Sequence, residues 1–150
     1  MPDRTILFVC TGNTCRSPMA EAIARDLLAR RPIDEPPVQV RSAGTTAMDG
    51  EPVSLEARAA VESLGMTFSK VRSAALTPAL IDDADAIYAM TRAHARAVLA
   101  IQPRAEGKVF LLDPEGSDVP DPIGAPQGVY TQTARRIRDL IARRIQEQSI

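Results

Sequence analysis

Two cysteines, an asparagine and an arginine lie close together near the N-terminus, in the stretch LFVCTGNTCRSP at residues 7–18. A loop of small polar residues that leads into a helix directs several backbone N–H groups inward, and the helix dipole adds to their attraction for anions. Arg16 adds a fork of donors that can hold two oxygens of a tetrahedral oxyanion. The stretch therefore predicts a phosphate-binding loop. Besides Arg16, its members are Thr11, Gly12, Asn13, Thr14, Cys15 and Ser17.

Cys10 occupies the first position of this loop, where its thiol can point into the same concavity. Amide dipoles and a nearby guanidinium favour the thiolate, which is the nucleophilic form of cysteine. A thiolate, an oxyanion cradle and an arginine can together attack phosphorus and hold the developing charge. A single cysteine at a strand end is more often a small buried hydrophobic residue. The conjunction with Gly12, Asn13 and Arg16 favours catalysis instead.

A second polar segment, DPEGSDVPDPIGAP at residues 113–126, shows neither helical nor strand periodicity. A loop of this length inside a compact domain is typical of a functional or disordered segment. An acid-bearing loop over a phosphate cradle is a chemically sensible arrangement, because a leaving group needs a proton.

The elements around the first loop follow from the hydrophobic pattern. Residues 5–9, TILFV, form a continuous apolar run that predicts a strand buried on both faces. A helix is expected from Ser17 to about Arg30. Ser17 is expected to cap it, Pro18 to take its first position, and Glu21 to complete a capping-box spacing.

The rest of the chain alternates between strand-like and helix-like segments. Four strands, each followed by a helix or long loop, predict one α/β domain over residues 1–150, with a four-stranded parallel sheet and helices on both faces. The phosphate-binding loop would then lie at the carboxyl end of the first strand, where open sheets of this class bind ligands. The further strands are expected at 38–41, 86–90 and 108–112, and the further helices at 54–64, 78–81, 91–100 (capped by Thr91) and 129–145.

The composition limits which kinds of partner and which cellular compartment are expected. The formal net charge of -1 gives no reason to expect nucleic acid or an anionic membrane as partner. No apolar run approaches the roughly 20 residues that cross a bilayer, and the N-terminus lacks the features of a secretory signal. A monomeric cytoplasmic protein with free thiols is therefore expected.

Several segments resemble one known family. The stretch VCTGNTCRSPMAEA at 9–22 is similar to the phosphate-binding loop of the low-molecular-weight protein tyrosine phosphatases. RSAGT at 41–45, DADAIYAMT at 83–91 and VPDPIG at 119–124 agree with the same family. The resemblance implies a two-step mechanism on phosphorylated proteins that needs no metal or other cofactor.

The resemblance also implies roles for individual residues of the phosphate-binding loop. Cys10 would form a phosphocysteine intermediate, and Arg16 would hold the phosphoryl oxygens. Ser17 would donate a hydrogen bond to the Cys10 thiolate, while Asn13 with Ser42 would fix the conformation of the loop.

Asp121, followed by Pro122, would be the general acid that protonates the leaving group and then the base that activates water. Asp113 and Asp118 are weaker candidates for this acid, because no Pro-Asp-Pro sequence surrounds them. For Cys15, the resemblance implies a reversible disulfide with Cys10 that guards against over-oxidation. Simple packing of Cys15 behind the loop is the alternative.

Two positions bear on the substrate. Thr14 stands where tyrosine phosphatases of the family carry a bulkier aliphatic residue, and Ile123 stands where many members have an aromatic residue. CTGNTCRSP is similar to the bacterial protein arginine phosphatases of the same family, which have Thr at this position. Asp118 or Asp121 can pair with a substrate guanidinium, so phosphoarginine is favoured over phosphotyrosine. Ile123 fits neither pattern well.

Further residues separate the competing classes. Lys70 and Val71 lie where family members often have a supporting His, and the single histidine, His94, is expected on a helix face without a catalytic role. Arsenate reductases of this fold need cysteines well beyond the loop, and none follows Cys15. A cysteine-phosphorylated sugar-transport carrier would lack Arg16 and the Asp-Pro loop, and a non-catalytic phosphate-binding module would need no thiol.

Overall fold

The first strand lies in the middle of a parallel sheet because it is apolar throughout. In the computed structural model, which describes residues 4–32, 34–70, 72–147 and 149–150, β1 (Arg4–Cys10) is buried from Ile6 onward. It pairs in parallel with two strands, β2 (Val38–Gly44) and β3 (Ala86–Ala89), and β4 (Val109–Leu111) pairs in parallel with β3. The order β2-β1-β3-β4 confirms the predicted four-stranded parallel sheet.

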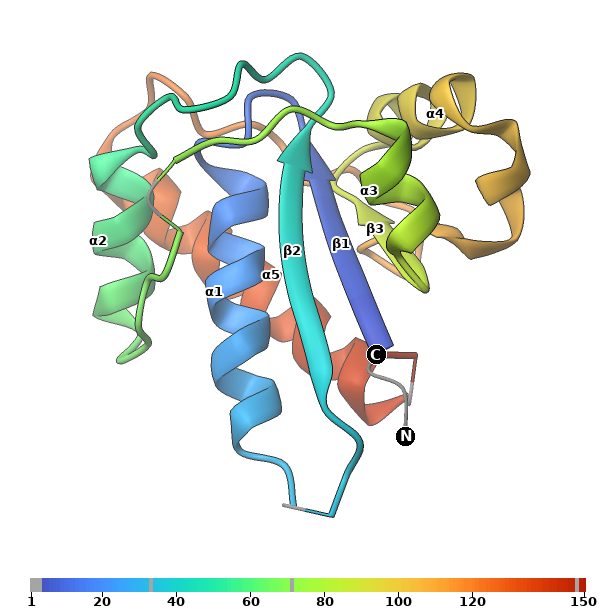
Figure 1. Cartoon of the computed structure of the whole chain (residues 1–150). Helices are drawn as coiled ribbons and strands as arrows, with labels where there is room; N and C mark the ends of the chain where they lie inside the picture. The colour runs from blue at the N-terminus through green and yellow to red at the C-terminus, as the bar shows by residue number, and fades with distance from the viewer. Residues whose placement is uncertain (1–3, 33, 71, 148) are drawn as a thin grey trace.

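Helices cover both faces of this sheet, as Figure 1 shows. Successive side chains of β1 point to opposite faces, so Ile6, Phe8 and Cys10 join one core cluster and Leu7 and Val9 join the other. Cys10 therefore faces the side of the first helix. The first cluster includes residues of α1 (Arg16–Ala29), α2 (Leu55–Ser63) and α5 (Gln127–Gln146), and the second includes residues of α3 (Pro78–Asp83) and α4 (Arg92–Ile101).

The start of α1 differs from the expected capping box. The helix begins at Arg16, its N-cap residue is Cys15, and no side chain caps it. Ser17 and Glu21 are both buried and bond to other parts of the chain. The expected cap was wrong because the preceding backbone curls into the phosphate-binding loop, which leaves Ser17 inside the first turn.

Most other boundaries agree within a few residues. Thr91 caps α4 as predicted, because its side chain accepts a hydrogen bond from the backbone N–H of His94. β2 is longer than expected and continues through Gly44, and α5 begins at Gln127. A short 3-10 helix over Pro103–Lys108, which was not expected, joins α4 to β4.

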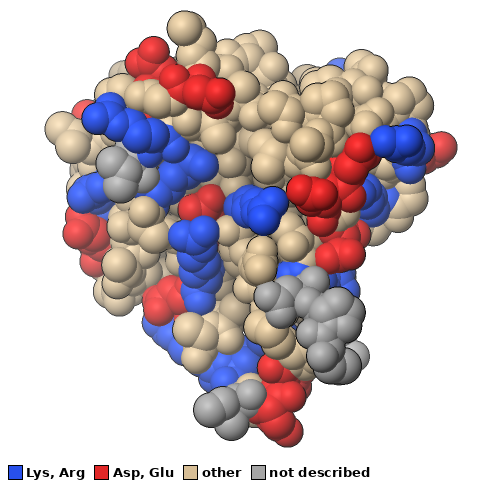
Figure 2. Space-filling model, viewed as in Figure 1, with Lys and Arg blue, Asp and Glu red and all other residues tan. Residues whose placement is uncertain are grey.

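Charged side chains of both signs are interspersed on the face shown in Figure 2. Within the described ranges, no helix combines the length and the apolar character that a membrane span requires.

Candidate active site

The phosphate-binding loop fills the gap between β1 and α1, at the carboxyl edge of the sheet. The end of β2 supports the start of this loop. Cys10 pairs with Gly44, and the Cys10 carbonyl accepts a hydrogen bond from the N–H of Thr45 at 2.8 Å. A side chain at Gly44 would collide with the backbone of Thr11 and Asn13. The SAG sequence that ends β2 thus lets the two backbones approach closely.

Cys10 and Ser17 are hydrogen-bonded in the buried interior of the loop. Their Sγ and Oγ atoms lie 2.8 Å apart, and the Ser17 Oγ accepts from Nδ2 of Asn13, also at 2.8 Å. Because the Asn13 Nδ2 group can only donate, the serine proton is left for an acceptor, and the Cys10 sulfur at 2.8 Å is closer than the Ala43 carbonyl at 3.5 Å. This is the geometry expected if Ser17 stabilises a Cys10 thiolate.

Asn13 holds the loop in a left-handed turn, with a φ of 53° and no exposed surface. Its Nδ2 also donates to the Ser42 Oγ at 3.0 Å, and its Oδ1 accepts from the N–H of Ala74 at 2.8 Å. One side chain therefore joins the loop to β2 and to the segment before α3. The structure brings Asn13, Ser17 and Ser42 together as predicted.

Behind Ser42 lies an ionic group that the sequence did not reveal. The Ser42 Oγ donates to the buried carboxylate of Glu21 at 2.9 Å, and Arg25 lies 3.3 Å from the same carboxylate. Lys70 donates to the Ser42 carbonyl at 3.1 Å and lies 3.9 Å from Glu21. Burial lowers the pKa of Lys70, while Glu21 opposes this shift. Lys70 thus supports the strand beside the loop; Val71, noted with it above, lies outside the described residues.

Arg16 is almost fully buried and spans the two functional loops. Its NH1 donates to the Val119 carbonyl at 2.8 Å, its NH2 donates to the Thr11 Oγ1 at 3.3 Å, and the same NH2 lies 3.5 Å from the Asp121 carboxylate. The guanidinium therefore joins the phosphate-binding loop to the aspartate-bearing segment 113–126, called the acid loop below.

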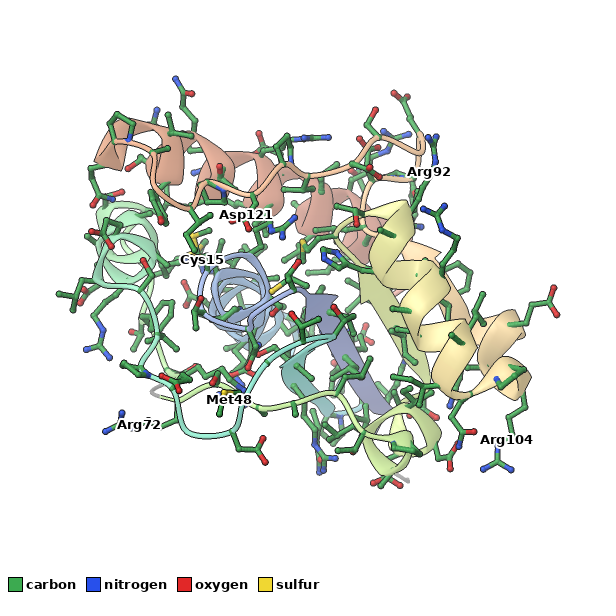
Figure 3. All side chains as sticks on the ribbon, turned by 90° about the horizontal axis from the view of Figure 1, so that it is seen from above. Cys15, Met48, Arg72, Arg92, Arg104 and Asp121 are labelled. Carbon is green, nitrogen blue, oxygen red and sulfur yellow. The ribbon has the colours of Figure 1, made fainter. Side chains whose placement is uncertain are left out.

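Asp121 lies at the cavity above Cys10. Its side chain is 41% exposed and accepts from the N–H of Ile123 at 3.0 Å. Figure 3 shows Asp121 on the loop that passes beside Cys15, with Met48 and Arg72 on the opposite side. The cavity has a volume of about 130 Å³, and its lining is Cys10, Thr11, Gly12, Thr14, Cys15, Arg16, Asp121 and Ile123.

The other two aspartates of the acid loop are occupied elsewhere. Asp118 accepts from the backbone N–H of Arg92 at 2.9 Å, at the first turn of α4, and does not line the cavity. Asp113 lies 3.2 Å from Arg136 and accepts from the N–H of Glu115. Of the three aspartates that are candidates for the general acid, Asp121 is the one that lines the same cavity as Cys10.

Cys15 differs from Cys10 in its surroundings. Its sulfur lies 3.9 Å from the Tyr130 hydroxyl and 3.8 Å from the Thr14 Oγ1, and burial raises the pKa of its thiol. The Thr14 carbonyl accepts from the N–H of Ser54 at 2.9 Å, which ties this part of the loop to the start of α2. These contacts fit the packing role, and the redox role stays a prediction.

His94 lies on α4 as expected but also contacts the phosphate-binding loop. Its Nε2 is 2.8 Å from the Thr11 Oγ1 and its Nδ1 is 3.0 Å from the Thr91 Oγ1. The 83 residues between His94 and Thr11 explain why no local pattern reveals this contact.

This chain is similar to known proteins in sequence and in fold. Residues 5–148 match the family described as Low molecular weight phosphotyrosine protein phosphatase. A protein-arginine-phosphatase from Geobacillus stearothermophilus is 40% identical, with 95% of this chain and 94% of that protein covered. A low molecular weight protein-tyrosine-phosphatase, PtpB from Staphylococcus epidermidis, is 34% identical, with 91% and 93% covered.

A solved structure of the YwlE arginine phosphatase, a cysteine-to-serine mutant with a phosphorylated active site serine, superposes with a TM-score of 0.87. It is 35% identical, and the comparison covers 96% of this chain and 94% of that one. The chain belongs to the low molecular weight phosphotyrosine protein phosphatase family.

Proposed function

We propose that this protein hydrolyses phosphoarginine in proteins through a phosphocysteine intermediate. The observation that carries the mechanism is the cavity in which Cys10, Arg16 and Asp121 meet. The Cys10 thiolate attacks phosphorus, an S–P bond forms, and the bond to the leaving nitrogen breaks. Asp121 donates the proton that the leaving nitrogen takes up. Arg16 and the loop N–H groups hold the charge on the phosphoryl oxygens.

The second step returns the enzyme to its starting state. The Asp121 carboxylate, now deprotonated, takes a proton from water, whose oxygen attacks phosphorus. The S–P bond breaks, inorganic phosphate leaves, and the Cys10 thiolate is stabilised again by Ser17 at 2.8 Å. The phosphorylated active site serine of the YwlE mutant supports attack from this loop position.

Three observations favour phosphoarginine. Thr14 lines the cavity, where its small hydroxyl-bearing side chain leaves room for a polar group. Asp121 offers a carboxyl group at the same cavity, which can hydrogen-bond to the guanidino nitrogens of the substrate. None of the residues that the described chain contributes to the lining is aromatic, so a substrate ring would find no stacking partner there. The similar protein from Geobacillus stearothermophilus is named for arginine.

Phosphotyrosine is the second candidate. Ile123, which is 68% exposed at the mouth of the cavity, could pack against a substrate ring, and PtpB is named a tyrosine phosphatase. Arsenate reduction and simple phosphate binding remain remote, because no cysteine follows Cys15 and because the cradle holds a thiol.

The substrate is tested by comparing kcat/KM on phosphoarginine and phosphotyrosine peptides of the same sequence. We expect the wild type to favour phosphoarginine, and Thr14→Ile to shift the ratio at least about tenfold toward phosphotyrosine. Thr133→Ile, on α5 and outside the cavity, is the matched control. An unchanged ratio in Thr14→Ile would mean that Thr14 does not determine the substrate preference.

The chemistry is tested separately with p-nitrophenyl phosphate in a chelating buffer. Hydrolysis should disappear in Cys10→Ser and fall strongly in Asp121→Asn. Activity that survives Cys10→Ser would exclude the phosphocysteine mechanism.

We also propose that the protein acts in the cytoplasm, as a monomer, on phosphorylated proteins. Both cysteines are free in the structure, which suits a reducing compartment. Light scattering of the purified protein should give the mass of one chain, 16.2 kDa.

A further inference from the structure

We propose that His94 is a positioning residue that holds the Arg16 guanidinium in place through the hydroxyl group of Thr11. It would thereby connect the first turn of α4 to the phosphate-binding loop. The inference rests on the phosphatase chemistry proposed above and does not depend on the choice between phosphoarginine and phosphotyrosine.

The contacts form a continuous path from helix to guanidinium. The His94 imidazole is buried, with 6% of the residue exposed. Thr91, the N-cap residue of α4, lies 3.0 Å from its Nδ1, and Thr11 lies 2.8 Å from its Nε2. The Thr11 Oγ1 in turn receives a hydrogen bond from NH2 of Arg16 at 3.3 Å.

The donor chemistry of Arg16 fixes the direction of the first bond. A guanidinium can only donate, so the Thr11 oxygen accepts from Arg16. In the proposed path the Thr11 proton goes to Nε2 of His94. Nε2 then carries no proton, and the ring is the Nδ1–H tautomer that donates to Thr91.

Burial, with the positive charge of Arg16, keeps the ring in this neutral form. Burial and the positive charge of Arg16 lower the pKa of His94 to about 4, while Asp118 and Asp121 act in the opposite direction. A neutral ring presents the lone pair that the Thr11 proton needs.

Arg16 depends on this path because its remaining anchors lie on the acid loop. Its other neutral partner is the Val119 carbonyl, and its charged partner is Asp121 at 3.5 Å. Thr11 is thus the contact that ties the guanidinium to the loop holding Cys10. A donor fixed before the reaction stabilises developing charge better than one that must reorient. Loss of the His94 acceptor would free the Thr11 hydroxyl to rotate and would loosen Arg16.

The first experiment compares substitutions at His94. Substrate turnover is measured with p-nitrophenyl phosphate, and vanadate inhibition reports on oxyanion binding. We expect His94→Ala to lower kcat/KM and to weaken vanadate binding, each about tenfold. His94→Gln can place an amide oxygen near the Nε2 position and should recover most of both values. Arg96→Ala, on the exposed side of α4, is the matched control and should behave as wild type.

The second experiment separates positioning from general destabilisation. Thr11→Val keeps the shape of the side chain and removes the hydroxyl, so it should reproduce the defect of His94→Ala. The double variant should be no worse than either single variant, because both remove the same path. Additive losses, or vanadate binding that stays at the wild-type level in Thr11→Val, would overturn the proposal.

The third measurement uses the fact that the chain contains one histidine. ¹⁵N NMR at neutral pH should show the proton on Nδ1 and a free lone pair on Nε2. The opposite tautomer would overturn the direction of the path. If Cys10→Ser retained activity, the proposed mechanism would fail, whereas the vanadate and NMR results would still report on His94.

Discussion

The phosphate-binding loop and the acid loop face the same cavity but are held in different ways. Asn13 and Ser17 of the first loop are fully buried and bond to other side chains and to the neighbouring strand. The acid loop is held by guanidinium groups on its backbone carbonyls, and its Asp121 is 41% exposed. Arg16 donates to Val119, Arg92 to Gly116 and Arg136 to Asp118. Figure 3 shows Arg92 at the start of α4, away from Asp121.

The difference follows from the task of each loop. A buried polar group that loses its partner cannot form a replacement hydrogen bond with water. Removing any hydrogen bond behind the phosphate-binding loop therefore costs stability. The Arg92 and Arg136 tethers are exposed, so water can replace them at little cost, whereas the Arg16 tether to Val119 is buried. The cradle is therefore built to keep one shape, while the acid loop keeps its aspartate accessible to substrate and water. Substitutions behind the phosphate-binding loop should therefore lower activity and stability more than substitutions of the acid-loop tethers.

The largest effect is expected from Asn13→Ala, in the buried network. The change removes three side-chain hydrogen bonds and places alanine at a φ of 53°. We expect kcat/KM to fall at least about 100-fold and the free energy of unfolding to fall by about 3 kcal/mol. Denaturant unfolding and p-nitrophenyl phosphate turnover measure both. Asn13→Gly, which tolerates this φ, should be more stable than Asn13→Ala by about 1 kcal/mol.

An intermediate effect is expected from Lys70→Met, one layer further from the cavity. Glu21 would keep Arg25 at 3.3 Å but lose the second cation, so the free energy of unfolding should fall by about 2 kcal/mol. The double variant Lys70→Met with Glu21→Gln should be more stable than Lys70→Met alone, because the unbalanced charge is removed with its partner. Equal stability of the two variants would contradict an unbalanced charge on Glu21 in Lys70→Met.

A smaller effect is expected from Arg136→Met, which removes a tether of the acid loop at the Asp118 carbonyl and at Asp113. We expect a change of less than about 1 kcal/mol in the free energy of unfolding. Activity should fall about threefold on p-nitrophenyl phosphate and further on phenyl phosphate, whose poorer leaving group depends more on the general acid. Arg138→Met, on the same helix and paired with Asp139, is the control. A uniform loss on both substrates would contradict a link to Asp121.

The last effect appears only as the pH is lowered and concerns the stability contributed by His94. Its pKa is about 4 in the folded protein and 6.5 as the ordinary value, so the unfolded chain binds the proton more readily. The free energy of unfolding therefore falls as pH decreases from 6.5 toward 4. We expect wild type to lose about 1 kcal/mol more than His94→Gln between about pH 7 and pH 5.5. Parallel pH curves for the two proteins would contradict a neutral buried ring.

Much of the fold and of the candidate site can be predicted from short stretches of the sequence. The continuous apolar run of β1, the small polar loop and the following helix are neighbours along the chain, so their pattern predicts both the fold and the grouping of Cys10 with Arg16. The Pro-Asp-Pro sequence likewise singles out Asp121. The predicted strand, the loop and the grouping of Cys10 with Arg16 are present in the structure because periodicity and turn chemistry act over a few residues, while the catalytic role of Asp121 stays a prediction.

The tertiary structure alone decided which polar side chains support the site. Glu21 follows a capping-box spacing, yet its carboxylate is buried against Ser42 of β2. His94 follows the pattern of a helix face, yet it meets Thr11, 83 residues away. A sequence pattern records which side of an element is buried, whereas the partner met on that side depends on how strands and helices pack. For this protein, the sequence determined the reacting groups, and the packing of α1, β2 and α4 determined what holds them.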